Sequence, residues 1–153
     1  MESTEFTKDT PVYAFKQEQC QGLLFCWKIR RGLERGLDTE RIKRYADWYY
    51  RSNLQHHFDI EESFIFPLLE EKSLLVKKAL TNHRRLKRLF MNTTNHLKTL
   101  SLLEEELEAY FLFERQRLIY EIKNSIPDKK LNIIMKIHKE SLSFEDWGDE
   151  FWR

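Results

Sequence analysis

Residues 57–69 read HFDIEESFIFPLL, and this stretch decides the expected fold. His57 and Glu61 lie four residues apart and Phe64 follows three residues later, a spacing that places all three side chains on one face of an α-helix. Pro67 cannot continue a regular helix, so it predicts a bend or an end close to its own position. The stretch therefore predicts the last turns of a long helix whose apolar face carries two ionisable groups.

The same pattern recurs in two later segments. Followed in steps of three and four residues, the stripes are Val76, Leu80, His83, Lys87 and Phe90 in one segment, and Leu103, Leu107, Tyr110, Glu114 and Leu118 in the other. Each stripe carries two polar groups four residues apart. Because a buried charge is costly unless it is paired or bound to a metal, three such stripes indicate a polar cluster inside a helical bundle.

The composition favours a helical fold. The chain has 153 residues with only 4 glycines and 3 prolines, too few for the many tight turns of an all-β domain. Charged residues make up 33% and hydrophobic residues 41%, a mixture typical of amphipathic helices. We therefore expect an all-α, up-and-down four-helix bundle that forms a single domain, residues 1–153. Its helices are expected at about residues 14–34, 39–70, 73–91 and 101–124, with a short C-terminal helix at 129–139 and an aromatic tail.

Charge and local patterns narrow the expected partners. The formal net charge is +1, and the basic residues are not part of any known nucleic-acid-recognition motif, so we expect no binding to nucleic acid. No apolar run of about 18 residues is present and the first residues lack the pattern of a secretory signal, so we expect a cytoplasmic protein away from membranes. The tail residues Phe144, Trp147, Phe151 and Trp152 either anchor a protein partner or a second copy, or pack on the bundle's own surface. The sequence does not identify a small ligand.

The remaining histidines and the two cysteines are expected outside the cluster or at its edge. His56 should turn to another helix face than its neighbour, where it is exposed or lies behind the cluster. His96 and His138 fall outside the stripes and are expected at the surface. Cys20 and Cys26 lie six residues apart on one helix and point to different faces, so no mutual disulfide is expected.

The residues of the stripes resemble the hemerythrin-like family, the HHE cation-binding domains, and in particular a bacterial subgroup. The similar segments are residues 22–30, 57–69, 82–86, 110–115 and 147–152. The most specific is the segment 57–69, which resembles the second-helix motif of the family, His-x-x-x-Glu-Glu followed by Phe-Pro. Residues 82–86 resemble the third-helix histidine segment, and residues 110–115 resemble the fourth-helix His-x-x-x-Glu with its histidine replaced. The resemblance covers residues 16–152.

Members of this family are four-helix bundles that hold two iron ions through histidines and bridging carboxylates, and they bind oxygen, sense redox state or nitric oxide, or handle iron. The resemblance implies that the surviving metal-ligand positions are His57, Glu61, His83 and Glu114. Three further ligand positions are altered. The replacing residues are Gln19 or Cys20 for the first-helix histidine, Lys87 for the second ligand of the third helix, and Tyr110 for the first histidine of the fourth.

The charge of Lys87 is expected to decide whether metal binds. At about 4 Å, a divalent ion and the ammonium group would repel each other by roughly 8 kcal/mol at an effective dielectric constant of about 20. We therefore expect that Lys87 lies among the buried ligands and replaces the metal charge. The alternative left open is one ion of iron, manganese or zinc, rather than two, with Tyr110 as a further ligand or hydrogen-bond donor. Cys20, if it faces the site, is either a redox-sensitive thiol or a small buried side chain.

These expectations lead to a functional hypothesis and two alternatives. The hypothesis is a hemerythrin-like domain with a degenerate di-iron site, without cofactor or catalytic residues, that serves as a binding, sensor or scaffold module and does not carry O2. The first alternative is a metal-binding sensor or iron-handling protein, mononuclear or di-iron, that uses the four surviving ligand positions. The second is an oxidase-like or iron-repair enzyme, for which no substrate-pocket feature is visible in the sequence.

Overall fold

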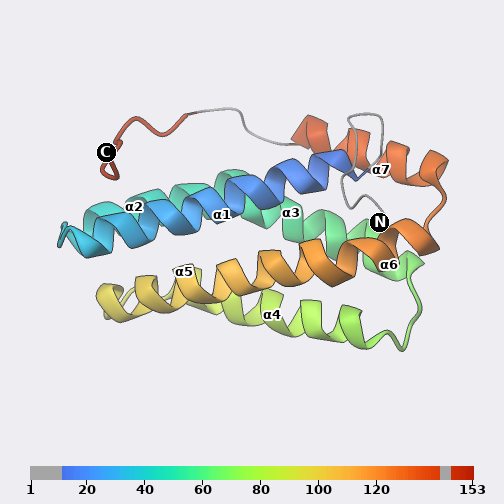
Figure 1. Cartoon of the computed structure of the whole chain (residues 1–153), viewed down its shortest axis with the longest axis horizontal. Helices are drawn as coiled ribbons and strands as arrows, with labels where there is room; N and C mark the ends of the chain where they lie inside the picture. The colour runs from blue at the N-terminus through green and yellow to red at the C-terminus, as the bar shows by residue number, and fades with distance from the viewer. Residues whose placement is uncertain (1–11, 142–145) are drawn as a thin grey trace, which may run out of the picture.

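The computed structural model describes residues 12–141 and 146–153, and these residues form helices and no strand (Figure 1). The α-helices are α1 (Tyr13–Glu34), α2 (Thr39–Tyr49), α3 (Gln55–Ile60), α4 (Leu74–Met91), α5 (His96–Phe113), α6 (Ile119–Ser125) and α7 (Asp128–Ser141). Three π-helical turns, Tyr50–Leu54, Glu61–Ile65 and Glu114–Leu118, and one 3-10 turn, Phe66–Leu68, join some of them end to end. The prediction of an all-α fold is thus confirmed for the described residues.

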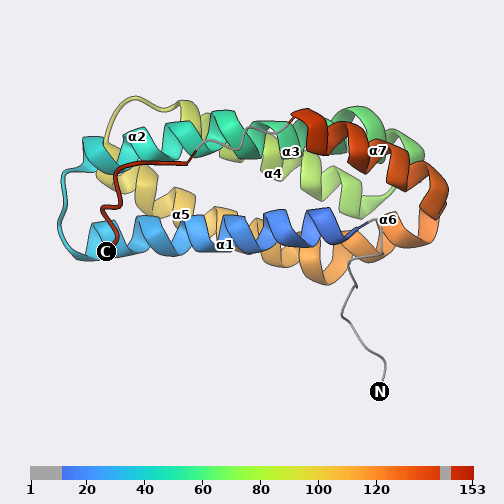
Figure 2. The same ribbon diagram turned by 90° about the horizontal axis from the view of Figure 1, so that it is seen from above.

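The elements combine into four long rods and one shorter helix. Residues 39–68 form one continuous rod that contains α2 and α3, and residues 96–125 form another that contains α5 and α6. Successive rods run in opposite directions, so α1 lies beside the α2–α3 rod and α4 beside the α5–α6 rod (Figures 1 and 2). Helix α7 folds back at one end of this helical bundle and packs against α3.

Capping residues fix where the rods begin. The Asp38 side chain accepts a hydrogen bond from the backbone N–H of Glu40 at 3.1 Å and starts α2, and Ser73 does the same for α4. Helix α5 begins at His96, five residues before the predicted start at 101, because the polar turn at residues 92–95 is the whole connection. Asn95 ends that turn in the left-handed conformation at φ 49°, and its carbonyl already accepts the first helical bond from Thr99 at 3.0 Å.

A close approach between α1 and α5 brings the middle of the bundle together. A Cβ atom at Gly22 would lie 2.1 Å from Cε2 of Phe111, so only glycine lets the two helices pack this closely. The Phe111 ring in turn packs edge-on against His57, with 5.7 Å between the ring centres. This contact places the middle of α1 against the middle of the α5–α6 rod.

The C-terminal segment packs on the opposite end of the bundle. Tyr45 on α2 contacts the rings of Trp147, Phe151 and Trp152, with ring centres 5.3 to 6.0 Å apart. Asp149 accepts charged hydrogen bonds from Arg41 at 2.6 and 2.7 Å. The described part of the predicted aromatic tail therefore packs on the protein's own surface. Phe144, the first aromatic residue of that prediction, lies outside the described residues.

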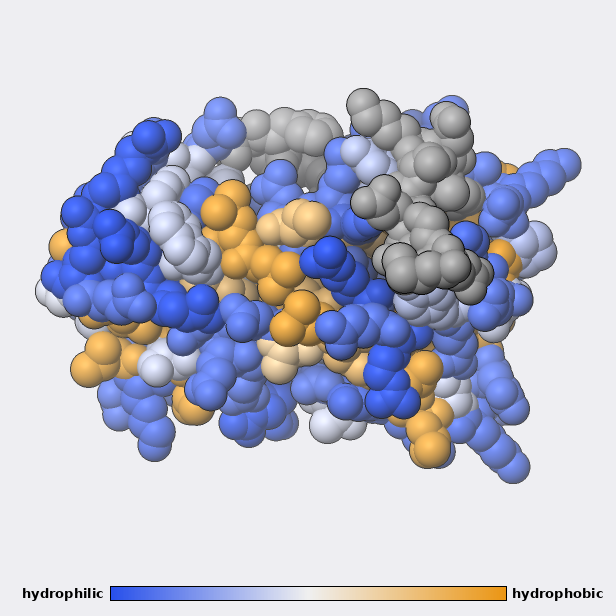
Figure 3. Space-filling view, in the orientation of Figure 1, coloured by the Kyte–Doolittle hydropathy of each residue, from blue (hydrophilic) through white to orange (hydrophobic). Residues whose placement is uncertain are grey.

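The face of the molecule shown in Figure 3 is largely hydrophilic, with apolar side chains gathered in small areas between hydrophilic ones. Within residues 12–141 and 146–153, no helix has the length and apolar character needed to cross a lipid bilayer.

Candidate metal centre

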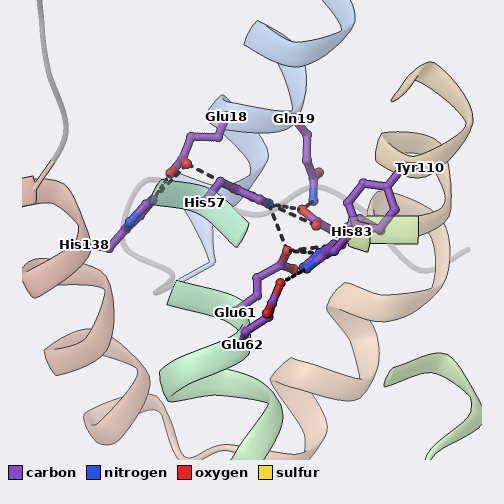
Figure 4. A network of polar contacts seen from close by, with 9 residues as sticks. Glu18, Gln19, His57, Glu61, Glu62, His83, Tyr110 and His138 are labelled. Carbon is purple, nitrogen blue, oxygen red and sulfur yellow. Dashed lines mark hydrogen bonds and ion pairs between the residues drawn. The ribbon is translucent and has the colours of Figure 1, made fainter. Parts of the chain in front are cut away.

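Four ionisable side chains meet in the middle of the bundle, each with at most 2% of its surface exposed (Figure 4). They are His57, Glu61, His83 and Glu114. The Nε2 atom of His57 lies 3.0 Å from both carboxylate oxygens of Glu114 and 3.5 Å from Oε1 of Glu61. The Nε2 atom of His83 lies 3.1 Å from the same oxygen of Glu61. Glu61 therefore stands between the two imidazole rings.

Gln19 and Tyr110 complete the wall of this cluster. The Gln19 amide donates a hydrogen bond to Oε1 of Glu114 at 2.9 Å. The Tyr110 hydroxyl donates to Oε1 of Glu61 at 3.1 Å and lies 2.6 Å from Nε2 of His83. The sequence left open whether Gln19 or Cys20 faces the site, and the structure answers that it is Gln19. Cys20 is exposed, so the alternative in which Cys20 faces the site is wrong.

The prediction that Lys87 lies among the buried ligands is also wrong. Lys87 is exposed, whereas Leu86 is 1% exposed and packs in the core. A helical stripe can continue from His83 after three residues or after four, and here the apolar Leu86 takes the inward position. Lys87 is turned by about 100° from it around the helix axis, into solvent. Its ammonium group therefore cannot replace a metal charge inside the bundle.

Two of the π-helical turns begin at the carboxylates of the site. The backbone N–H of Phe66 bonds to the carbonyl of Glu61, and that of Ile119 bonds to the carbonyl of Glu114, each across five residues instead of four. The extra residue rotates the side chains that follow, so Phe64, predicted to face the core, is 48% exposed while Ile65 is fully buried. Such local widening of a helix is frequent at functional sites.

A second carboxylate–histidine contact, missed in the sequence, reaches His57 from outside the cluster. The Nδ1 atom of His57 lies 3.0 Å from Oε1 of Glu18, and Nε2 of His138 lies 2.8 Å from both oxygens of Glu18. The prediction that His138 lies at the surface is wrong, because only 2% of it is exposed. The signal was present in the spacing of the buried face of α7, which consists of Leu131, Ile134, Met135 and His138. His56 and His96 are half-buried and lie outside the cluster.

The two buried carboxylates differ in their preferred charge. Burial alone would raise the pKa of Glu114, but the charge and hydrogen bonds of His57 outweigh it and lower this pKa to about 2. Burial, followed by the nearby charge of Glu114, raises the pKa of Glu61 to about 7. Of the two, Glu114 therefore stays ionised at neutral pH, and Glu61 is the group that takes up a proton more readily.

Both histidines are surrounded by carboxylates on their two ring nitrogens. His57 lies between Glu18 and Glu114, and Nδ1 of His83 lies 2.7 Å from the half-exposed Glu62. Burial would lower the pKa of each imidazole, but for His57 the charges of Glu114 and Glu61, and for His83 the hydrogen bonds to Glu61 and Glu62, raise it. Without a bound ion, these contacts favour the imidazolium form of both rings, because an ionised carboxylate accepts a hydrogen bond and does not donate one.

The donor set fits a metal ion. One ligand atom each from His57, Glu61 and Glu114 lie within 4.8 Å of one another, and all three residues are buried. Two buried oxygens, Oε2 of Glu61 and Oε1 of Gln19, have no hydrogen-bond partner in the part of the chain that the structure describes. Buried acceptors without a donor are costly, and a cation at this point would satisfy the Glu61 oxygen.

The chain matches no family model, no curated protein and no solved structure. Function therefore has to be inferred from the chemistry of this site.

Proposed function

We propose that this protein is a hemerythrin-like, metal-binding module that holds one transition-metal ion and serves as a sensor or store, not as a carrier of O2. His57, Glu61 and Glu114 would hold the ion, and His83 and Tyr110 lie on the far side of Glu61. The observation that carries the proposal is the convergence of these three buried donors, one of which, Glu61, has a buried oxygen without a hydrogen-bond partner among the described residues.

The charge of the cluster favours one ion. Among the fully buried groups, two imidazolium cations balance the carboxylates of Glu61 and Glu114 when no metal is present. One divalent ion that replaces the Nε2 proton of His57 and leaves His83 protonated adds a single positive charge. A second divalent ion would add two uncompensated charges to a dry interior, which is costly. Because Lys87 is exposed to solvent, its ammonium group does not repel a single ion in the cluster.

The ligand types narrow the metal. Imidazole nitrogens and carboxylate oxygens suit iron, manganese and zinc. A bound ion of this kind would act as a Lewis acid or redox centre, and the chain's own residues would position it and keep water away. Because His57 must lose a proton to act as a ligand, metal binding would release a proton and weaken at acid pH.

Carriage of O2 is disfavoured by the two replaced histidines. Gln19 and Tyr110 stand where the resemblance leads us to expect nitrogen ligands, and both hydrogen-bond to carboxylates of the site. Only two imidazole rings, those of His57 and His83, then remain for metal. This donor set is better suited to holding one ion than to the paired irons of an oxygen carrier.

A second candidate is the metal-free binding or scaffold module. It is favoured by the complete pairing of the two rings, since each ring nitrogen of His57 and His83 has a carboxylate partner. In that state the cluster would be a buried, charge-balanced network that specifies the packing of the bundle.

Metal analysis separates the two candidates. Protein purified without chelator and then dialysed is expected to retain about one equivalent of iron, manganese or zinc, and the stripped protein to take up one Co²⁺ with visible absorption bands. Glu114→Gln should abolish uptake, and Glu105→Gln, an exposed control, should not. Absence of stoichiometric metal in the wild type would reject the metal-binding proposal in favour of the metal-free module.

A further inference from the structure

The contact between Glu18 and His138 lies outside the three residues proposed to hold the ion, although Glu18, His57 and His138 also offer ligand atoms within 4.8 Å of one another. Glu18 comes from the first turns of α1 and His138 from the last turns of α7, so the pair joins two elements at the end of the bundle (Figure 4). Oε1 of Glu18 accepts from both histidines, at 3.0 Å from Nδ1 of His57 and 2.8 Å from Nε2 of His138. A continuous chain of hydrogen bonds thus runs from α7 to the buried cluster.

Glu18 supplies a hydrogen-bond acceptor for one ring nitrogen of His57, and Glu114 supplies one for the other. When a metal ion takes the lone pair of Nε2, the atom that faces Glu61 and Glu114, the one remaining ring proton is on Nδ1, where the Glu18 carboxylate accepts its hydrogen bond. Metal-binding histidines commonly donate their other N–H to a carboxylate, which fixes the tautomer and raises the basicity of the ligand.

We propose that Glu18 and His138 are positioning residues that hold His57 in the tautomer and orientation needed for metal, and that through His138 they couple the docking of α7 to metal binding. This inference rests on the proposed function. Glu18 acts directly on the ring of His57, and His138 acts through Glu18.

The packing of α7 makes such a coupling physically reasonable. Its buried face consists of three apolar residues, Leu131, Ile134 and Met135, followed by His138, while Ile133 and Ile137 on the other side are 58% and 48% exposed. His138 is therefore the polar contact at the C-terminal end of a short apolar face. If this contact strengthens metal binding, bound metal must strengthen the contact by the same factor, because coupling between two sites is reciprocal.

The affinity test uses Co²⁺ titration of stripped, full-length protein, followed by visible absorption, with Zn²⁺ as competitor. Glu18→Gln is expected to weaken Co²⁺ binding by roughly 10- to 100-fold and to shift the absorption bands, because the ligand field of His57 changes. His138→Leu should weaken it in the same direction. His138→Gln should restore most of the affinity, since its amide can donate to Glu18. Glu34→Gln on α1 and Lys139→Gln on α7, both exposed, are the matched controls.

The coupling test uses hydrogen–deuterium exchange of the backbone amides of residues 131–141. In the wild type, Co²⁺ is expected to slow their exchange by about the factor by which loss of the His138 contact, in His138→Leu, weakens Co²⁺ binding. In Glu18→Gln, Co²⁺ should leave exchange in α7 unchanged. If His138→Leu does not fold, Glu18→Gln still carries both tests because the side chain keeps its shape.

The outcomes for the inference and for the proposed function are distinguishable. If Glu18→Gln binds Co²⁺ and Zn²⁺ as tightly as the wild type does, the positioning role is overturned and the metal-binding proposal stays intact. If Co²⁺ does not change the rate of amide exchange in α7 of the wild type, the coupling is overturned. A wild type that binds neither ion overturns the proposed function and this inference with it.

Discussion

Replacement of Glu114 by glutamine is expected to destabilise the metal-free protein at pH 7, whereas the same change at Glu61 is not. The two carboxylates are equally buried and both contact His57. They differ in the charge that the folded state prefers, so the pair separates electrostatic effects from those of shape and burial. Glu105→Gln, an exposed change, provides the baseline.

The magnitude follows from the pKa values. The folded state lowers the pKa of Glu114 from 4.5 to about 2, which corresponds to about 3 kcal/mol of stability. This contribution is present above pH 4.5 and is lost as the pH falls through about 2. The pKa of Glu61 is raised from 4.5 to about 7, so its ionisation costs stability above pH 4.5, and by pH 7 this cost also reaches about 3 kcal/mol. Glu114→Gln should therefore lose about 3 kcal/mol at pH 7, and Glu61→Gln should lose nothing or gain up to that amount.

Urea unfolding followed by circular dichroism, in buffer with chelator, measures both changes. For a chain of this size, a loss of 3 kcal/mol also lowers the melting temperature by roughly 6 to 12 °C. Repeating the unfolding at pH 4 should shrink the effect of Glu61→Gln first, since the cost of ionising Glu61 disappears below pH 4.5. Equal destabilisation by the two substitutions at pH 7 would refute the assignment of Glu114 as the anion that pairs with His57.

Three further outcomes are expected. Gly22→Ala should destabilise the fold by about 1 to 3 kcal/mol in thermal unfolding, because the new methyl group meets Phe111, whereas Gly148→Ala, with nothing within 4 Å, should have no effect. Lys87→Gln should leave the Co²⁺ affinity within about twofold of that of the wild type, because the ammonium group is in solvent. A large gain in affinity would contradict this and indicate that the ammonium group lies close to the bound ion. The affinity for Co²⁺ should rise with pH, since the raised pKa of His57 makes the ion compete with its ring proton; titrations that show no dependence on pH would contradict this competition.

The sequence predicted the parts of the fold that depend on local spacing. The stripe that contains Tyr110 and Glu114 is buried as predicted along its whole length, and Asp38 and Ser73 begin helices where expected. The contact between His57 and Glu61 also followed from their spacing on one helix face. Such features depend on the helical repeat and on capping, which a single segment reveals by itself.

The errors occurred where tertiary packing chooses between equal local options. Both Leu86 and Lys87 continue a stripe from His83, and only the neighbouring helices decide which one turns inward. The π-helical turns at Glu61 and Glu114 leave no mark in local propensity. His138 was missed because its partner, Glu18, is 120 residues away and the two meet only when α7 folds back on the bundle.

The location of a bound ion tests the central claim most directly. A crystal of the protein grown with one equivalent of Co²⁺ or Zn²⁺ and measured at the absorption edge of that metal is expected to show one anomalous peak. The peak should lie about 2.0 to 2.2 Å from Nε2 of His57 and from carboxylate oxygens of Glu61 and Glu114. No peak among these three residues would contradict metal binding at this site, and two peaks bridged by Glu61 would contradict the single ion.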